Sequence, residues 1–126
     1  MVKTKSVYDP VEPSDGQRIL VSRYRPRGIP KERLCLTEWR RELAPSKELL
    51  REWKSKRISW SEYKARYDRE MVPQRPMINA LAQRANTHVI CLLCFEPEGD
   101  PHCHRHLLKK MIVAAGVGPE LMLQSP

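Results

Sequence analysis

The stretch Val89-Ile90-Cys91-Leu92-Leu93-Cys94-Phe95 decides the fold, because it is apolar without a break. A strand that alternates apolar and polar residues buries one face, whereas a continuously apolar strand is buried on both faces. Residues His88–Phe95 are therefore predicted to form the central strand of a sheet with further layers above and below it. Such strands are typical of parallel α/β sheets.

A helix is predicted after this strand and a short loop, from Pro101 to about Ala115. Asp100 is a suitable N-cap residue, and proline is favoured at the first helical position. His102 and His106 are expected to point outward, whereas His104 is expected to face the sheet. It shares one helical face with apolar residues, namely Leu108, Met111, Ile112 and Ala115.

The rest of the chain supplies further strands and helices, separated by clusters of proline. Strands are predicted at Lys3–Tyr8, at Arg18–Tyr24 and, shorter, at Pro119–Leu123. Capping residues and apolar spacing predict the helices Glu38–Leu43, Lys47–Trp53, Trp60–Met71 and Met77–Ala85. This order of elements predicts one α/β domain over residues 1–126, a layer sandwich with a small, mainly parallel sheet flanked by helices.

Composition narrows the class of protein. The chain has 126 residues, of which 40% are hydrophobic, so it can form a modest core. No stretch approaches the roughly 20 apolar residues that a membrane-spanning helix needs, and no signal peptide is apparent. We therefore expect a cytoplasmic protein that does not enter membranes, with its four cysteines reduced.

The segment Cys103-His104-Arg105 is the first candidate site, because it falls at the start of the predicted helix. The dipole and free amides of a helix N-terminus stabilise negative charge, which favours a cysteine thiolate. Cys103 is therefore the candidate nucleophile and His104 the candidate acid or base, with Arg105 binding an anion. A purely structural alternative stays open, in which His104 bonds a loop carbonyl and Cys103 is inert.

Arg23, Arg25 and Arg27 form the second candidate site, at the end of the second strand. They alternate along the chain, so all three would project from one side of an extended segment. Guanidinium groups suit phosphate, sulfate or carboxylate. If the strands are parallel, these arginines and Cys103 share one edge of the sheet and form a pocket for a small anionic ligand or a phosphate-bearing substrate. The alternative is a solvated basic loop.

The pair Cys91-x-x-Cys94 raises the question of a metal. Zinc could take both cysteines, Cys103 and a histidine as ligands. Residues three apart on a strand lie on opposite faces, however, so we expect no metal. A redox pair of Cys94 and Cys103 stays open. No glycine-rich nucleotide motif is present, and no cofactor is expected.

The order of several motifs resembles the YeaO-like family, the domain-of-unknown-function group numbered 488. The matching motifs are Val7-Tyr8-Asp9-Pro10, Ile19-Leu20-Val21-x-Arg23, Pro26-Arg27-Gly28, Glu42-Leu43-Ala44-Pro45-Ser46 and Trp60-x-Glu62-Tyr63. The segment Cys94-x-Glu96 with Cys103-His104-Arg105 is similar to a motif of a longer branch of that family. The resemblance implies a small α/β domain of cytosolic prokaryotic origin, and it implies no particular reaction.

Two functions follow from these residues. The leading hypothesis is a protein with an anion-binding pocket at the strand ends, and whether it is an enzyme acting through Cys103 and His104 is left open. The rival hypothesis is a non-catalytic nucleic-acid-binding protein that uses basic helices. The net charge of +8 supports the rival, whereas the lack of a groove-reading motif opposes specific recognition.

We predict that binding to a labelled DNA duplex is weak and independent of sequence. The net charge of +8 attracts phosphates, but nothing in the chain reads base edges. In a fluorescence titration, affinity should fall by more than about tenfold between about 50 and about 200 mM salt. Tight binding at the higher salt that prefers one duplex over a scrambled one would favour the rival hypothesis.

Overall fold

A four-stranded parallel sheet forms the centre of the computed structural model, which describes residues 1–116. The strand order is β1-β4-β2-β3, and every neighbouring pair is parallel. The strands are β1 (Val2–Ser6), β2 (Gln17–Leu20), β3 (Glu38–Trp39) and β4 (Ile90–Cys94). The predicted small parallel α/β sheet is therefore confirmed. The strand predicted at Pro119–Leu123 lies outside the described residues.

Strand β4 occupies the interior of the sheet, as its apolar sequence predicts. All five of its residues are buried. It pairs with β1, where Val2 lies opposite Ile90, and with β2, where Gln17 lies opposite the same residue. At the entrance to β2, the chain passes so close to β4 that a Cβ on Gly16 would lie 2.3 Å from the Val89 carbonyl oxygen. Glycine is required there, because its φ is also +65°.

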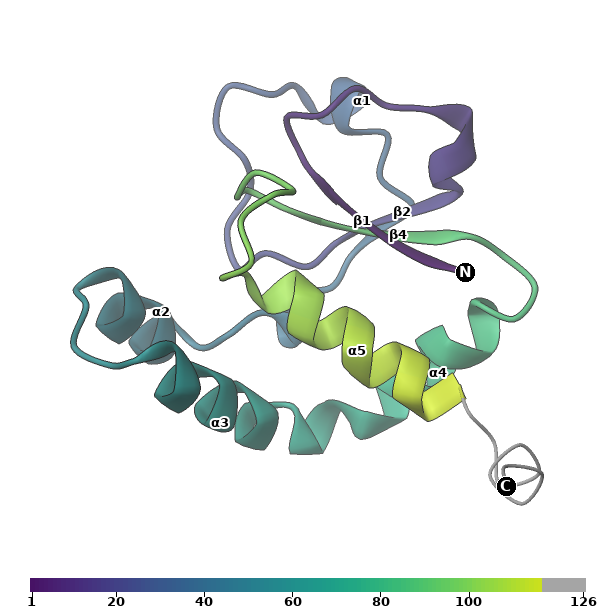
Figure 1. Cartoon of the computed structure of the whole chain (residues 1–126). Coiled ribbons are helices and arrows are strands. Elements are labelled where there is room, and N and C mark those ends of the chain that lie inside the picture. The colour runs from purple at the N-terminus through teal and green to yellow at the C-terminus, as the bar shows by residue number, and fades with distance from the viewer. Residues whose placement is uncertain (117–126) are drawn as a thin grey trace, which may run out of the picture.

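Helices cover the two faces of the sheet unequally. In Figure 1, α3, α4 and α5 lie below the strands, whereas the short α1 lies above them. No helix among residues 1–116 is long and apolar enough to cross a membrane. The helices are α1 (Lys31–Leu34), α2 (Lys47–Lys54), α3 (Trp60–Glu70), α4 (Arg75–Arg84) and α5 (His104–Gly116), and 3-10 turns lie at Pro13–Asp15, Arg41–Leu43 and Val72–Gln74.

The predicted caps explain where α2 and α3 begin. The Ser46 hydroxyl accepts a hydrogen bond from the backbone N–H of Leu49. At α3, the Ser59 hydroxyl accepts from the Glu62 N–H, while the Glu62 side chain accepts from the Ser59 N–H. Both motifs use backbone donors that a helix start leaves free. These two helices begin where the sequence predicts them.

The helix predicted at Glu38–Leu43 is wrong. Residues Glu38–Trp39 instead form the edge strand β3, and only Arg41–Leu43 form a 3-10 turn. The edge of β2 captures this segment, since the Arg40 N–H donates to the Leu20 carbonyl at 2.8 Å. The Trp39 indole N–H also donates to the Ser22 carbonyl. Tertiary hydrogen bonds therefore override a local helical pattern.

The predicted start of the last helix is also wrong by three residues. Helix α5 begins at His104 and not at Pro101. Asp100 does not cap this helix, because its side chain accepts from the N–H of His102 in a tight turn. Cys103 consequently lies immediately before the helix rather than inside its first turn.

The core has two parts, one on each face of β4. Ile90 and Leu92 pack against the helices below the sheet, in a cluster that also contains Tyr67. Cys91 and Leu93 pack on the opposite face, toward α1. The period of two along the strand thus separates the two clusters, and both are apolar because β4 is covered on both sides.

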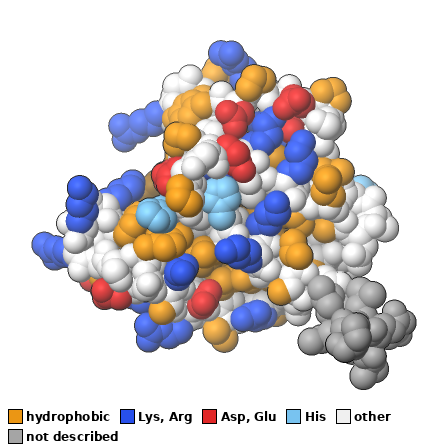
Figure 2. All heavy atoms as spheres, in the orientation of Figure 1, with side chains coloured by type: hydrophobic (Ala, Val, Ile, Leu, Met, Phe, Trp, Pro, Cys, Tyr) orange, Lys and Arg blue, Asp and Glu red, His pale blue; other side chains and the backbone are white. Residues whose placement is uncertain are grey.

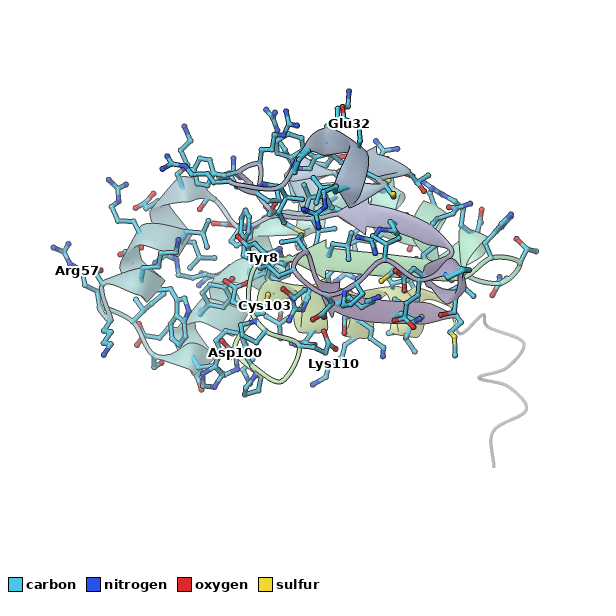
Figure 3. The ribbon with its side chains drawn as sticks, turned by 90° about the horizontal axis from the view of Figure 1, so that it is seen from above. Tyr8, Glu32, Arg57, Asp100, Cys103 and Lys110 are labelled. Atoms are coloured by element: carbon cyan, nitrogen blue, oxygen red, sulfur yellow. The ribbon has the colours of Figure 1, made fainter. Side chains whose placement is uncertain are left out.

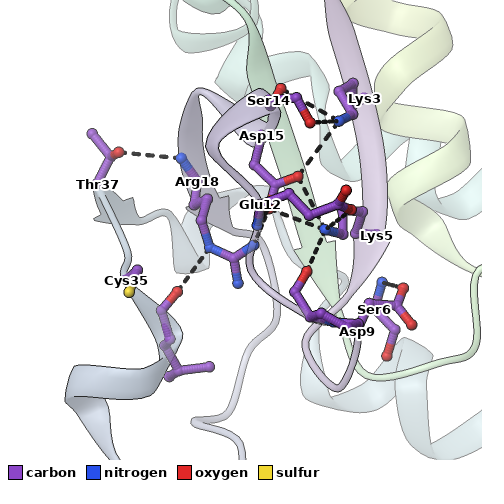
Figure 4. A network of polar contacts seen from close by, with 12 residues as sticks. Lys3, Lys5, Ser6, Asp9, Glu12, Ser14, Asp15, Arg18, Cys35 and Thr37 are labelled. Carbon is purple, nitrogen blue, oxygen red and sulfur yellow. Dashed lines mark hydrogen bonds and ion pairs between the residues drawn. The ribbon is translucent and has the colours of Figure 1, made fainter.

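A buried ionic network closes the upper face, as Figure 4 shows. Its centre is the fully buried carboxylate of Asp15, which accepts from Lys5 Nζ at 3.0 Å and from Arg18 Nη1 at 2.6 Å. Burial alone would raise the pKa of Asp15. The Glu12 backbone N–H together with Lys5 and Arg18 lowers it to about 2. The network ties the loop after β1 to β2.

We predict that Asp15→Asn lowers the free energy of unfolding by about 3–5 kcal/mol, because it leaves two buried cations without their anion. The contribution of Asp15 is present above about pH 4 and is lost as the pH falls toward about 2, where the folded carboxylate takes up a proton. Urea denaturation at several pH values measures this. Glu12→Gln is the matched control, since that side chain is mostly exposed and should change stability little. An equal loss in both variants would contradict the central role of Asp15.

Candidate functional site

A cavity of about 220 Å³ opens at the carboxyl ends of β2 and β4. This is the edge where open α/β sheets bind their ligands. Arg23, which follows β2, and Cys103, which precedes α5, both line it. The prediction that these two segments share one edge of the sheet is therefore confirmed. Figure 3 shows Cys103 within the fold and the loop that carries Asp100 beside it.

Cys103 forms the chemical centre of the cavity. Only 2% of the residue is exposed, and it lines the cavity. Its sulfur lies 3.2 Å from Glu96 Oε2 and 3.9 Å from His104 Nδ1. A thiol in this position can donate to either group, which makes both of them candidate proton acceptors.

His104 is held in one orientation by the end of β2. Its Nε2 lies 2.7 Å from the Val21 carbonyl oxygen, which can only accept a hydrogen bond. Nε2 therefore carries the proton, and in the neutral ring the lone pair of Nδ1 faces Cys103. A purely structural histidine was expected to hydrogen-bond a loop carbonyl, and that hydrogen bond is present. The same hydrogen bond also fixes the tautomer that a base for Cys103 requires.

Cys94 completes a pair of neighbouring thiols. The donor atoms of Cys94, Cys103 and His104 all lie within 4.8 Å of one another. The Cys94 thiol donates toward the Cys103 sulfur, and this contact has the largest effect on the pKa of Cys103. Burial acts in the opposite direction. With the help of His104, the Cys94 contact lowers the pKa of Cys103 to about 6. The same contact and burial raise the pKa of Cys94 far above the usual range. Cys103 is therefore the thiolate, and Cys94 keeps its proton.

Glu96 adds a second negative charge beside the thiols. Burial would raise the pKa of Glu96, but hydrogen bonds from the Cys103 thiol, while that group is protonated, and from Cys94 lower it. The ionised carboxylate in turn opposes ionisation of Cys103. Cys94, Cys103 and Glu96 thus form a short chain of groups along which a proton can move.

Aromatic rings form one wall of the cavity. Trp53 and Tyr63 line it, and Trp60 stacks on Tyr63 with ring centroids 4.8 Å apart. The exposed His102 packs on Trp60 at 4.7 Å, so this histidine belongs to the aromatic wall. Figure 2 shows histidines beside a hydrophobic area on this face of the molecule. The wall suits a flat or apolar part of a ligand.

The four arginines predicted to bind an anion lie in different surroundings. Arg23 lines the cavity, where its Nε donates to the Pro45 carbonyl at 2.8 Å. Arg25 and Arg27 are exposed and are not among the lining residues. Arg105 is fully buried and donates from its two terminal nitrogens to the carbonyls of Lys5 and Pro97. The prediction that Arg23, Arg25 and Arg27 project from one side required an extended backbone. The turn after Val21 ends that extended backbone. Anion binding by Arg25, Arg27 and Arg105 stays a prediction.

One group of side chains among residues 1–116 has the arrangement of a soft-metal site. It consists of Cys94, Cys103 and His104, whose donor atoms lie within 4.8 Å of one another. Cys91 is not part of it, because that side chain packs in the core on the other face of β4. The opposite orientation of Cys91 and Cys94 is therefore confirmed, and the expectation that the protein binds no metal stays a prediction.

Several site residues were not assigned from the sequence. Glu96 could have been assigned from the sequence, because it follows β4 at the edge where Cys103 was expected. Nothing in the sequence assigns Trp53, Lys54 and Tyr63 to the site, because their spacing only indicates a packed helical face. Their place in the cavity depends on how α2 and α3 lie against the sheet edge.

We predict that Cys103 is the first cysteine to react with iodoacetamide. Its rate should rise through about pH 6 and level off above about pH 7, because only the thiolate is nucleophilic. His104→Ala should move this rise to higher pH. Site-resolved mass spectrometry measures the rates, with exposed Cys35 as the reference for access and buried Cys91, whose pKa burial raises to about 11, as the slow reference. A rate for Cys103 that keeps rising to about pH 8.5, as for an ordinary thiol, would contradict the lowered pKa.

Comparison with known proteins agrees with the motifs. A sequence model described as the active DUF488-N3 subclade matches residues 2–116. The uncharacterized protein YeaO of Escherichia coli K12 is 38% identical over 92 residues, which cover 73% of this chain and 80% of YeaO. The uncharacterized protein Rv3073c of Mycobacterium tuberculosis H37Rv is 41% identical over 71 residues, 56% of this chain and 59% of that protein. No solved structure matches the chain significantly. The chain belongs to the YeaO-like DUF488 family.

Proposed function

We propose that the protein is a cysteine-dependent enzyme that removes a phosphoryl group from a small substrate with a flat ring. One observation carries the proposal: the Cys103 sulfur lies 3.9 Å from a histidine nitrogen whose ring is oriented by a carbonyl, and both groups line a cavity. A nucleophile, a base and a third group that orients the base are the recurring parts of covalent catalysis. The description of the matched subclade as active agrees with a reaction at this site.

The reaction has two steps in this proposal. The Cys103 thiolate attacks phosphorus, an S–P bond forms, and the ester P–O bond breaks. The leaving oxygen takes the electron pair of that bond and a proton from the His104 imidazolium. Water then attacks phosphorus, the S–P bond breaks, the thiolate returns, and His104 takes the proton from water. His104 thereby serves first as acid and then as base.

The lining of the cavity supports a small substrate with an anionic group. A volume of about 220 Å³ holds a single ring and its substituent, and Trp53 and Tyr63 offer a surface for that ring. Arg23 and Lys54 supply positive charge, and the N-terminus of α5 favours an anion near Cys103. Glu96 and Asp100 also line the cavity, and their carboxylates disfavour a phosphate beside them, which leaves Arg23 and Lys54 as its partners.

Nucleic-acid binding remains a second candidate function. A shallow hollow beside the cavity is lined by Tyr24, Lys47, Arg51 and Lys54. Basic side chains next to an exposed tyrosine are typical of surfaces that hold a nucleic-acid strand. The salt dependence of duplex binding tests this function separately from catalysis.

We predict that the protein hydrolyses p-nitrophenyl phosphate and that Cys103→Ser lowers kcat by more than about a thousandfold. Arg23→Ala should raise KM for this ester about 10- to 100-fold, since it removes a charge-assisted contact to phosphate. The neutral ester p-nitrophenyl acetate should lose turnover with Cys103→Ser but show little change in KM with Arg23→Ala. Cys35→Ser is the matched control and should keep full activity, because Cys35 is exposed and is not among the lining residues.

Each outcome has a separate meaning. Turnover that survives Cys103→Ser would overturn the nucleophile. Turnover of the acetate alone, with Cys103 required, would overturn the phosphate part and retain covalent catalysis. No turnover of either ester by a protein whose Cys103 alkylates rapidly would contradict the proposed reaction and leave the lowered pKa intact.

A further inference from the structure

We propose that Cys94 and Cys103 are a site of reversible oxidation, at which a hydroperoxide converts the two thiols into an intramolecular disulfide. The proposal does not depend on the phosphatase reaction. It concerns the same sulfur atom, however, so oxidation would remove the nucleophile from the cavity.

The position of the two sulfurs is the first support. Cys94 is the last residue of β4, and Cys103 immediately precedes α5. Their sulfurs lie within 4.8 Å of each other, although the residues are nine positions apart. A disulfide needs a sulfur separation of about 2.05 Å, so the two sulfurs must move closer together. Arg105 donates to the Pro97 carbonyl at 2.8 Å and holds the start of the intervening loop, so the movement falls to Cys103 and to the exposed residues near Gly99.

The two thiols differ as the chemistry requires. The Cys103 sulfur lies 3.9 Å from Nδ1 of His104, which can take its proton, so Cys103 is the sulfur that attacks an oxidant. The Cys94 sulfur lies within 4.8 Å of the Cys103 sulfur and can resolve the first product. A small hydroperoxide reaches Cys103 through the cavity, which both cysteines line.

The reaction balances with one hydroperoxide. The Cys103 thiolate attacks the terminal peroxide oxygen, an S–O bond forms, and the O–O bond breaks. The departing alkoxide takes the electron pair and a proton from the His104 imidazolium, which leaves an alcohol and a sulfenic acid. The Cys94 sulfur then attacks the Cys103 sulfur, the S–O bond breaks, and the oxygen leaves as water with the proton of Cys94. In sum, two thiols and a hydroperoxide give a disulfide, an alcohol and water.

The other two cysteines cannot take part without a change of fold. Cys91 packs in the core on the opposite face of β4. Cys35 is exposed at the end of α1, where its thiol donates to the Glu32 carbonyl. The structure therefore assigns the disulfide to one pair among the four cysteines.

The experiment treats the fully reduced protein, freed of metal with a chelator, with one equivalent of hydrogen peroxide near neutral pH. We expect a mass loss of about 2 Da, a peptide map that joins Cys94 to Cys103, and recovery of both thiols with dithiothreitol. Cys35→Ser, the matched control, should form the same disulfide at the same rate. A disulfide between other cysteines or between two chains would overturn the assignment.

Two further variants test the roles of the sulfurs, with circular dichroism to show that each is folded. Cys94→Ser should still oxidise at Cys103, but it should proceed to the sulfinic acid and resist dithiothreitol, because no thiol resolves the sulfenic acid. Cys103→Ser should leave Cys94 reduced under the same treatment. Oxidation of Cys94 at an unchanged rate in Cys103→Ser would reverse the roles and overturn the proposal.

A last comparison separates oxidation from metal binding and from catalysis. Purified protein that resists peroxide until the chelator is added would hold a metal on Cys94, Cys103 and His104, which would overturn the free dithiol. Ester turnover is measured in parallel before and after oxidation. Disulfide formation in a protein that turns over no ester would retain this proposal and reject only the phosphatase reaction.

Discussion

The pairing of β4 with β1 and β2 is the constraint on which the rest of the molecule depends. Because this strand is buried on both faces, the chain must place one layer above it and another below it. Its parallel neighbours bring the ends of β2 and β4 to one edge, where Cys94, Glu96 and Arg23 meet. Helix α5 returns beneath the sheet from the same edge and delivers Cys103. The candidate site is thus a consequence of sheet topology.

Most of the chemistry at that edge comes from competition for protons among buried groups that lie close together. Two thiols, a carboxylate and an imidazole meet there, and they cannot all be charged at once. The Val21 carbonyl settles the tautomer of His104, and the neighbouring Cys94 thiol and His104 settle which sulfur ionises. The same asymmetry supports a nucleophile in one proposal and a peroxide-sensitive pair in the other.

The basic character of the chain is only partly available for ligands. Arg18 and Arg105 are buried and hold loops in place through Asp15 and through backbone carbonyls. A guanidinium group suits this task because it offers several donors in a rigid plane. Arg23 alone of the predicted arginine loop reaches the cavity, so an excess of positive charge in the composition does not translate directly into an anion site.

The sequence by itself determined the central strand, the capped starts of α2 and α3, the inward face of α5 and the position of Cys103 and His104 at the strand ends. These features depend on residues close together in the chain, where apolar period and capping chemistry act locally. Only the tertiary structure decided that Glu38–Trp39 form a strand, that Cys94 lies beside Cys103, and that Trp53 and Tyr63 face the cavity. The reason is physical: a hydrogen-bonding sheet edge, a sulfur contact and a ring against a cavity each join segments that meet only after the sheet and helices have packed.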